Sequence, residues 1–88
     1  MAPKRKRIDF KILVPEAKSV ALSGTFNQWS ESSDPMKRDS TGMWKKTKML
    51  FEGKYEYKFI VDGEWKLDPE CDNIVPNEHG SYNNIIKV

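Results

Sequence analysis

The chain has 88 residues, of which 38% are hydrophobic and 11% aromatic, and its formal net charge is +2. This length predicts one domain, and the single cysteine excludes an intramolecular disulfide and a paired-cysteine zinc motif. No apolar run is long enough to span a bilayer, and the N-terminus lacks the apolar segment of a secretory signal. We therefore expect a soluble, cytoplasmic protein.

The positive charge is concentrated at the N-terminus. Residues 1–7 carry four basic side chains and no acidic one, so residues 8–88 carry a net charge of −2. We predict a flexible basic tail over residues 1–7 and a folded domain over residues 8–88. A solvated terminus is the simplest interpretation of the tail, and a nuclear address or a weak contact with a polyanion are the alternatives. Nucleic acid is not an expected partner of the slightly acidic domain.

The first half of the domain is predicted to hold two strands and a long loop. Apolar side chains alternate from Phe10 to Val14, which predicts a strand over residues 8–14, and a second strand is expected over residues 18–23. Residues 24–39 are rich in Ser, Asn, Asp and Pro and show no sustained period, so we expect a loop with at most one helical turn.

The second half of the domain is predicted to hold four more strands. The alternation from Tyr55 to Val61 is the clearest β pattern of the chain, and Asp62-Gly63 favours a two-residue type I′ turn because both residues tolerate positive φ angles. Lysines on both faces leave the register of the preceding strand open. The strands are expected at residues 43–50, 55–61, 64–67 and 82–88, with a loop over 70–80. Short strands and frequent turns, without an amphipathic helix, predict an all-β protein with an antiparallel β-sandwich.

Residues suited to catalysis are few. The only histidine, His79, lies in a loop beside Gly80 without a nucleophile motif around it, and nothing marks a pair of carboxylates for glycoside hydrolysis. The sequence also has no P-loop, no dinucleotide-binding glycine pattern and no metal-ligand spacing. We therefore predict that the protein is not an enzyme and takes no cofactor or metal.

Three tryptophans occupy different sequence contexts. Trp44 lies near the start of a predicted strand and is expected in the core. Trp29 lies among polar residues of the long loop, and Trp65 lies between Glu64 and Lys66, where alternation allows either face. One interpretation places Trp65 in the core and folds Trp29 back onto the sandwich as a loop anchor. In the other interpretation both indoles face a ligand.

The second interpretation fits a sugar. A pyranose ring has an apolar face of C–H groups and a rim of hydroxyls, so its site combines an exposed aromatic ring with amide, hydroxyl and ammonium groups. Residues that offer such polar groups are Lys58, Ser81, Asn83 and Asn84. Spacing alone does not show whether two tryptophans 36 residues apart come together.

Three segments resemble the glycogen-binding domain of the AMP-activated protein kinase β subunit. They are LSGTFNQW at residues 22–29, GKYEYKFIVDGEW at residues 53–65 and GSYNNIIKV at residues 80–88, with Asp68-Pro69 between the last two. The resemblance covers nearly the whole chain from about residue 8 onward, in order and in spacing. That domain belongs to a group of starch- and glycogen-binding modules that also precede the catalytic barrels of isoamylases and branching enzymes.

The resemblance implies an immunoglobulin-like β-sandwich of the early-set type that binds α-1,4-linked glucans without cleaving them. The site residues that it carries over by motif are Trp29, Lys58, Trp65, Ser81 and Asn83. Trp29 and Trp65 match the stacking tryptophans, Lys58 matches the lysine of the Tyr-Lys-Phe strand, and Ser81 and Asn83 match the hydroxyl and amide that bond the sugar rim. His79 is the sixth predicted site residue, and it departs from the pattern, because the family has a leucine there that projects into a curved glucan. A preference for tightly curved glucans is therefore not carried over.

The leading hypothesis is a non-catalytic module that binds glycogen or other α-glucans and targets a kinase or a glucan-modifying enzyme to them. The alternative is a structural or protein-interaction domain of the same fold, whose exposed tryptophans dock a neighbouring protein domain. The polar residues Lys58, Ser81 and Asn83 favour sugar hydroxyls as the ligand over a protein interface.

Overall fold

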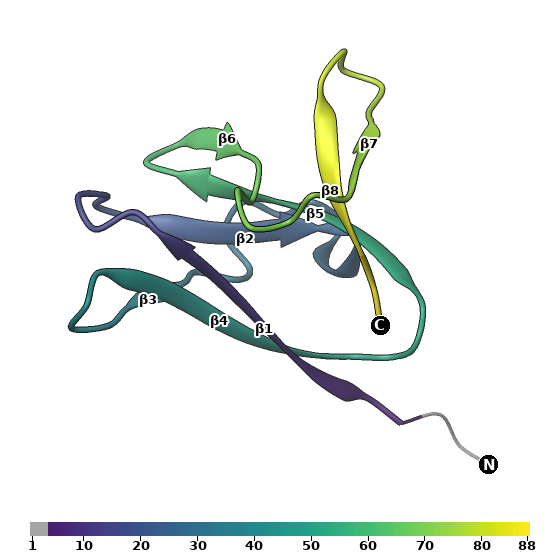
Figure 1. The fold of residues 1–88 in the computed structure, drawn as a ribbon, viewed down its shortest axis with the longest axis horizontal. Coiled ribbons are helices and arrows are strands. Elements are labelled where there is room, and N and C mark those ends of the chain that lie inside the picture. Colours follow the sequence, from purple (N-terminus) through teal and green to yellow (C-terminus); the bar gives the residue numbers. More distant parts are fainter. Residues whose placement is uncertain (1–3) are drawn as a thin grey trace.

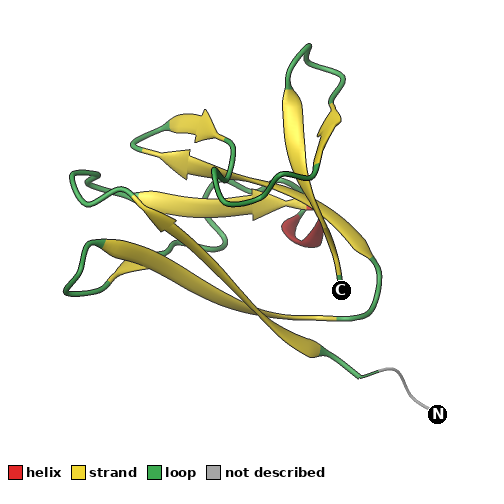
Figure 2. Ribbon diagram, viewed as in Figure 1, coloured by secondary structure: helices red, strands yellow, loops and turns green. Residues whose placement is uncertain are grey.

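The computed structural model describes residues 4–88, which form strands packed in two layers (Figures 1 and 2). One sheet has three strands in the order β1-β4-β3, and the other has five, with β2-β5-β8-β7 in order and β6 paired to β5. The strands are β1 (Lys6–Leu13), β2 (Val20–Gly24), β3 (Lys37–Arg38), β4 (Met43–Leu50), β5 (Lys54–Val61), β6 (Glu64–Lys66), β7 (Ile74–Pro76) and β8 (Tyr82–Lys87), and a 3-10 turn, η1 (Thr25–Asn27), follows β2. These antiparallel sheets confirm the predicted all-β, immunoglobulin-like β-sandwich.

Strand β5 organises the five-stranded sheet because it pairs along both of its edges. On one edge, β2 pairs with residues 57–61 of β5. On the other edge, β8 pairs with residues 54–57 and β6 with residues 59–61. Figure 1 shows the β7–β8 pair extending away from the rest of this sheet. Successive side chains of β5 point to opposite faces, so one row enters the core and the other row forms part of the outer face.

The core lies between the two sheets and is rich in aromatic rings. Phe10 of β1 packs edge-on against Tyr57 of β5, with ring centroids 4.9 Å apart, and Tyr57 packs in the same manner against Phe59 at 5.8 Å. Trp44 of β4 is 7% exposed, and its indole N–H donates to the carbonyl of Val14 at 3.1 Å. The prediction that Trp44 belongs to the core is thereby confirmed.

The hairpin between β5 and β6 has the turn that the sequence predicts. Asp62 and Gly63 have φ angles of 49° and 84°, and Val61 pairs with Glu64 across the turn, as in a type I′ hairpin. The Asp62 carboxylate also accepts hydrogen bonds from two backbone N–H groups that precede β2, at 2.8 and 2.9 Å. These bonds tie the turn to the segment that precedes β2.

Some elements differ from the prediction. β1 begins at Lys6, two residues earlier than expected, and β3 and β7 are short strands within segments predicted as loops. Strands of two or three residues are too short to show an alternating pattern. Of the predicted basic tail, residues 1–3 lie outside the described residues, whereas Lys6 and Arg7 belong to β1. A flexible tail stays a prediction.

The register of β4, which the sequence leaves open, is fixed by its pairing with β1. Ile12 pairs with Trp44 and Ile8 with Lys48, so Lys48 shares the inner face of the sheet with Trp44. The Lys48 ammonium lies 3.1 Å from the buried carboxylate of Asp34. A lysine can occupy this inward position because an opposite charge is buried beside it.

Candidate functional site

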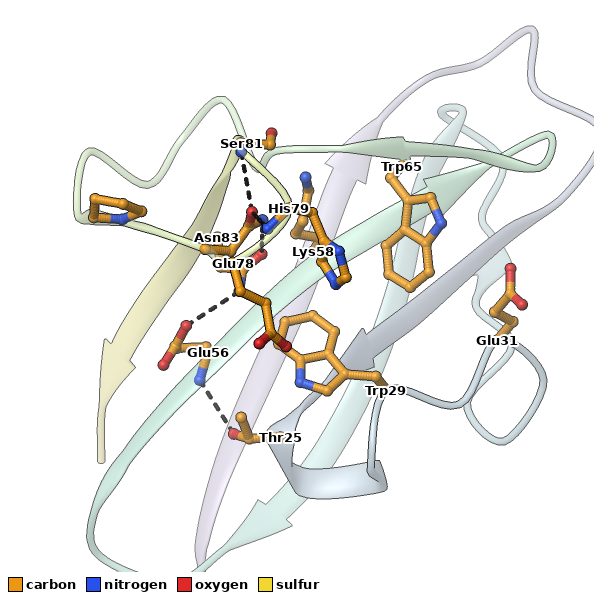
Figure 3. A pocket seen from close by; sticks show the side chains of 12 residues that line it. Thr25, Trp29, Glu31, Glu56, Lys58, Trp65, Glu78, His79, Ser81 and Asn83 are labelled. Atoms are coloured by element: carbon orange, nitrogen blue, oxygen red, sulfur yellow. Dashed lines mark hydrogen bonds between the residues drawn. The ribbon is translucent and has the colours of Figure 1, made fainter.

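A groove with a volume of about 820 Å³ lies on the outer face of the five-stranded sheet (Figure 3). Its residues come from β5, β6, β7 and β8, from the β2–β3 loop (residues 25–36) and from the β7–β8 loop (residues 77–81). The structure brings together all six predicted site residues, which are Trp29, Lys58, Trp65, His79, Ser81 and Asn83. The other lining residues are Thr25, Glu31, Glu56, Pro76, Asn77 and Glu78.

The two tryptophans of the groove lie side by side. Their ring centroids are 6.3 Å apart, and their ring planes are inclined at 55°. Trp65 pairs with Ile60 of β5, which places its side chain on the outer face of the sheet, and it is 42% exposed. The interpretation of Trp65 as a core residue is therefore wrong. Trp29 is half-buried and lines the groove from the β2–β3 loop.

The backbone of the β2–β3 loop is wound tightly at Trp29. Gln28 and Trp29 both adopt the left-handed region, with φ angles of 55° and 59°. This conformation costs a residue with a side chain roughly 1–3 kcal/mol, so it persists only where its surroundings impose it. The N–H of Trp29 donates to the carbonyl of Gly24 at 2.9 Å, which closes the turn around η1.

A buried polar network holds the β2–β3 loop in place. Asn27 accepts a hydrogen bond from the Gly24 N–H at 3.1 Å and donates to the Leu22 carbonyl at 3.1 Å and to Asp34 Oδ2 at 2.8 Å. Both oxygens of Asp34 accept from Lys48 Nζ, at 3.1 and 3.2 Å. Burial raises the pKa of Asp34, but the hydrogen bonds from Asn27 and Lys48 and the nearby positive charges outweigh burial and hold that pKa below its ordinary value. Asp34 therefore ties the loop to β4 as a carboxylate.

Lys58 lies on the outer face of β5, within the groove. It is only 9% exposed although it points away from the core, because the side chains and loops of the groove cover it. Its cross-strand neighbour is Ser23 of β2. The Ser23 hydroxyl is buried, and it has no hydrogen-bond partner within residues 4–88. A buried hydroxyl thus lies beside Lys58 on the neighbouring strand.

Asn77 shapes the β7–β8 loop. Its Oδ1 accepts hydrogen bonds from the N–H of His79 at 2.9 Å and from the N–H of Ser81 at 3.0 Å, and its own N–H donates to the Ser81 carbonyl at 3.0 Å. Gly80 has a φ angle of 76°, which this turn requires and glycine adopts without strain. The loop backbone is therefore held internally, while the side chains of His79 and Ser81 remain exposed at the rim.

Glu56 and Asn83 connect the two loops. Asn77 Nδ2 donates to Asn83 Oδ1 at 3.0 Å, and Asn83 Nδ2 donates to Glu56 Oε1 at 3.1 Å (Figure 3). The backbone N–H of Glu56 donates to Thr25 Oγ1 in the β2–β3 loop at 3.2 Å. Asn83 is 8% exposed and engaged at both ends of its amide, so it retains one N–H and one lone pair for a ligand.

Asn84 does not belong to the groove, contrary to the expectation that it offers an amide to a ligand. It is fully buried, and it pairs with Tyr57 on the inner side of the sheet. Its amide binds the backbone of Asp68 and Cys71. The hydroxyl of Tyr57 donates to the Asp68 carboxylate at 2.8 Å, and burial together with this contact raises the pKa of Tyr57. These contacts fix the chain between β6 and β7.

Sequence reasoning missed the residues that support the site. Asn77 carries a recognisable signal, because Asn with Gly three residues later is typical of a turn closed by the Asn side chain. Glu56 also carries one, since it is an acidic residue on the outward row of a strand whose other row is aromatic. Neither signal indicates that Glu56 and Asn77 meet through Asn83.

The groove offers two apolar ring faces surrounded by polar groups. Three carboxylates line it, from Glu31, Glu56 and Glu78, together with the ammonium of Lys58 and the imidazole of His79. Within residues 4–88, no group of three or more His, Cys, Asp or Glu side chains is arranged to hold a metal ion. The arrangement suits a ligand with neutral apolar faces and a rim of hydroxyls.

Comparison with known proteins gives one family and several relatives. The family described as "Glycogen recognition site of AMP-activated protein kinase" matches residues 9–88. The chain is 44% identical to 5'-AMP-activated protein kinase subunit beta-1 of Sus scrofa over 71 residues, which are 81% of this chain and 55% of that protein. It is 45% identical to the beta-1 subunit of Homo sapiens over 71 residues, which are 81% of this chain and 25% of the subunit.

A plant protein is similar as well. The chain is 47% identical to "Protein PTST homolog 2, chloroplastic" of Arabidopsis thaliana over 53 residues, which are 60% of this chain and 10% of that protein. The chain thus spans between a tenth and about half of the length of these relatives.

Proposed function

The chain belongs to the family described as the glycogen recognition site of AMP-activated protein kinase, and on this premise we propose that it is a non-catalytic module that binds α-1,4-linked glucans such as glycogen and maltooligosaccharides. The observation that carries the proposal is the pair of indoles in the groove, with centroids 6.3 Å apart and planes inclined at 55°. Two ring faces at an angle suit two sugars of a chain that bends between them.

Stacking on Trp29 and Trp65 supplies the main attraction. Each indole offers an apolar face to the C–H groups of a pyranose ring, and binding removes both surfaces from water. Hydrogen bonds from the sugar hydroxyls replace equally good bonds to water, so their net gain is small. We expect dissociation constants for short glucans of roughly micromolar to millimolar, about −4 to −8 kcal/mol.

Polar groups at the rim orient the sugar. Lys58 offers an ammonium, Ser81 a hydroxyl, and Asn83 the remaining N–H of an amide that Glu56 and Asn77 already hold. His79 is exposed on the β7–β8 loop and adds an imidazole at the rim. Because a polar imidazole stands there, we expect no strong preference for cyclic or tightly curved glucans.

The relatives suggest what such a module serves. They are named as a kinase subunit and a chloroplastic protein, and the chain covers 55% or less of each. We infer that the module targets a larger protein or complex, a kinase or a glucan-modifying enzyme, to its glucan. Within residues 4–88 no helix has the length and apolar character needed to cross a membrane. A cytoplasmic location stays a prediction, since one relative is named as chloroplastic.

The test replaces each groove tryptophan singly. Trp29→Ala and Trp65→Ala should each weaken glycogen binding in affinity gels roughly tenfold or more, because one stacking face is lost. Both variants should stay folded, with small shifts in melting temperature. Trp44→Phe is the matched control, since it removes an indole from the core and should lower the melting temperature while leaving glycogen binding unchanged.

Two outcomes would contradict the proposal. A folded Trp29→Ala that binds glycogen as wild type does would remove stacking as the mechanism. A wild-type chain that binds neither glycogen nor maltoheptaose would favour the alternative, a protein-interaction domain whose exposed tryptophans dock a neighbouring domain.

A further inference from the structure

A second hollow continues the outer face of the five-stranded sheet beyond the groove. Its volume is about 340 Å³, and its lining residues are Lys54, Asp72, Asn73, Ile74, Ile85 and Lys87. Because side chains alternate along β5, Lys54 lies in the same outward row as Glu56, which lines the groove. Ile85 of β8 pairs directly with Glu56, so the groove and the second hollow adjoin at this pair.

The second hollow carries two lysines directly opposite each other. Lys54 of β5 and Lys87 of β8 are cross-strand partners, and both are exposed. Within residues 4–88 neither lysine forms an ion pair, although Asp72 lines the same hollow. Like charges on directly opposite residues destabilise a sheet, so an anion between the two ammonium groups would relieve their repulsion.

The charge of the second hollow differs from that of the groove. Glu31, Glu56 and Glu78 line the groove together with a single lysine, Lys58. An anionic group close to the indoles would therefore meet three carboxylates and one ammonium group. In the second hollow the same group would meet two ammonium groups and one carboxylate. The surface thus favours neutral sugars at one end and a negative charge at the other.

We propose that the second hollow binds a phosphate monoester carried by an α-glucan whose neutral sugars lie on Trp29 and Trp65, an inference that rests on the function proposed above. A phosphate monoester carries close to two negative charges at neutral pH and three strong acceptor oxygens, which suit two adjacent ammonium groups. Trp65 pairs with Ile60, and Lys54 lies six residues away along β5, which is about 20 Å at the rise of a strand. A glucan of several units spans both subsites.

The test compares two forms of one polymer on the full 88-residue chain. The polymer is amylopectin that carries phosphate monoesters, and its counterpart is the same amylopectin after treatment with alkaline phosphatase. The double variant Lys54→Ala/Lys87→Ala removes the lysine pair. The control Lys11→Ala/Lys37→Ala removes two exposed lysines that both pair with Lys45 on the three-stranded sheet, so it changes the net charge equally.

At low salt, wild type and control should bind the phosphorylated polymer roughly three- to tenfold more tightly than the phosphatase-treated polymer, as two exposed charge contacts allow. The gain should shrink as salt rises. The Lys54→Ala/Lys87→Ala variant should bind both polymers as tightly as wild type binds the phosphatase-treated one. Inorganic phosphate, added at the concentration of the polymer's phosphate groups and at constant ionic strength, should not compete.

Three results would overturn the inference. The first is equal binding of the two polymers by wild type. The second is that the control variant loses the preference for the phosphorylated polymer as fully as Lys54→Ala/Lys87→Ala does. The third is competition by inorganic phosphate at that concentration, which would assign the hollow to a free anion. Failure of the proposed function is visible separately, because wild type would then bind neither polymer.

Discussion

The two loops that flank the groove are held by different chemistry. The β2–β3 loop depends on a buried ion pair, in which Asp34 joins Lys48 of β4 to the amide of Asn27. The β7–β8 loop depends on neutral amide contacts, in which Asn77 binds the loop backbone and Asn83. The first anchor reaches the opposite sheet, whereas the second stays within its own sheet.

Because of this difference, we expect one anchor to affect the stability of the fold and the other to affect ligand binding. Loss of the Asp34 anchor leaves charged and polar groups without partners in the interior, so it should affect the whole sandwich. Loss of the Asn77 anchor frees an exposed loop whose backbone can turn to water, so it should affect the rim of the groove alone. We therefore expect one loop to belong to the folding unit and the other to matter mainly for the proposed site.

The largest effect is expected for Asp34→Ala. This change leaves the Lys48 ammonium and the Asn27 amide without their carboxylate, and removing one partner of a buried pair costs 3–5 kcal/mol in general. Because the Lys48 side chain is 23% exposed, we expect the free energy of unfolding, measured with urea, to fall by about 2–3 kcal/mol. Glycogen binding should weaken too, because Trp29 lies on the same loop.

Asp34→Asn is the matched control for the charge. It keeps an acceptor oxygen for Asn27 or Lys48 and should lose less stability than Asp34→Ala. Equal stability of wild type and Asp34→Ala would show that the β2–β3 loop does not depend on this ion pair, and the contrast between the two loops would disappear.

A smaller effect, on binding alone, is expected for Asn77→Ala. It removes two bonds to the loop backbone and one to Asn83, so His79, Ser81 and the Asn83 amide lose their fixed positions. We expect roughly tenfold weaker glycogen binding and a loss of stability below about 1 kcal/mol. Affinity gels and urea unfolding of one preparation measure both quantities.

Asn77→Asp separates the two roles of Asn77. The carboxylate still accepts from the N–H groups of His79 and Ser81 but no longer donates to Asn83. If glycogen binding depends on the bonds from Asn77 to the loop backbone, the Asn77→Asp variant should bind glycogen better than Asn77→Ala does. A large fall in stability for Asn77→Ala would make the second loop a part of the folding unit, like the first.

The smallest effect on stability is expected from lowering the pH. The pKa of Asp34 is lowered in the folded chain, so its contribution to stability is fully present above the unfolded value of 3.8 and is lost as the pH falls through the folded pKa. The stability difference between wild type and Asp34→Asn should therefore be constant above pH 3.8 and shrink over the range from pH 3.8 down through the folded pKa. Comparing the two proteins removes the contributions of Asp9 and Asp39, whose pKa values are also lowered. A difference that stays constant over this range would contradict the role given to Asp34.

The sequence predicts most of the fold because local patterns specify it. The alternation of β5 and the Asp62-Gly63 turn are readable from neighbouring residues alone, and the structure confirms both. The strands β3 and β7 are not readable, because two or three residues show no period and their pairing partners lie elsewhere in the chain. The inward position of Lys48 is equally hidden, since only the three-dimensional structure brings Asp34 beside it.

The site is predictable only in its parts. Residue types and resemblance indicate Trp29 and Trp65, but their contact depends on how β2, β5 and β6 pair, which no local pattern specifies. Asn83 and Asn84 are neighbours of one type, yet the alternation of β8 sends the first toward the groove and the second into the interior. The role of Glu56 follows from contacts with both loops, which appear only in the folded chain.

The left-handed backbone at Gln28 and Trp29 has an evolutionary consequence. Glycine at either position would relieve backbone strain of roughly 1–3 kcal/mol. Under the proposed function, the residue that suits the ligand at position 29 is therefore not the residue that suits the fold. A copy of this domain freed from sugar binding would drift toward glycine or asparagine there and become more robust as its indole disappeared. Under the proposed function, a tryptophan kept at position 29 in a descendant of the chain would therefore indicate that the descendant still binds sugar.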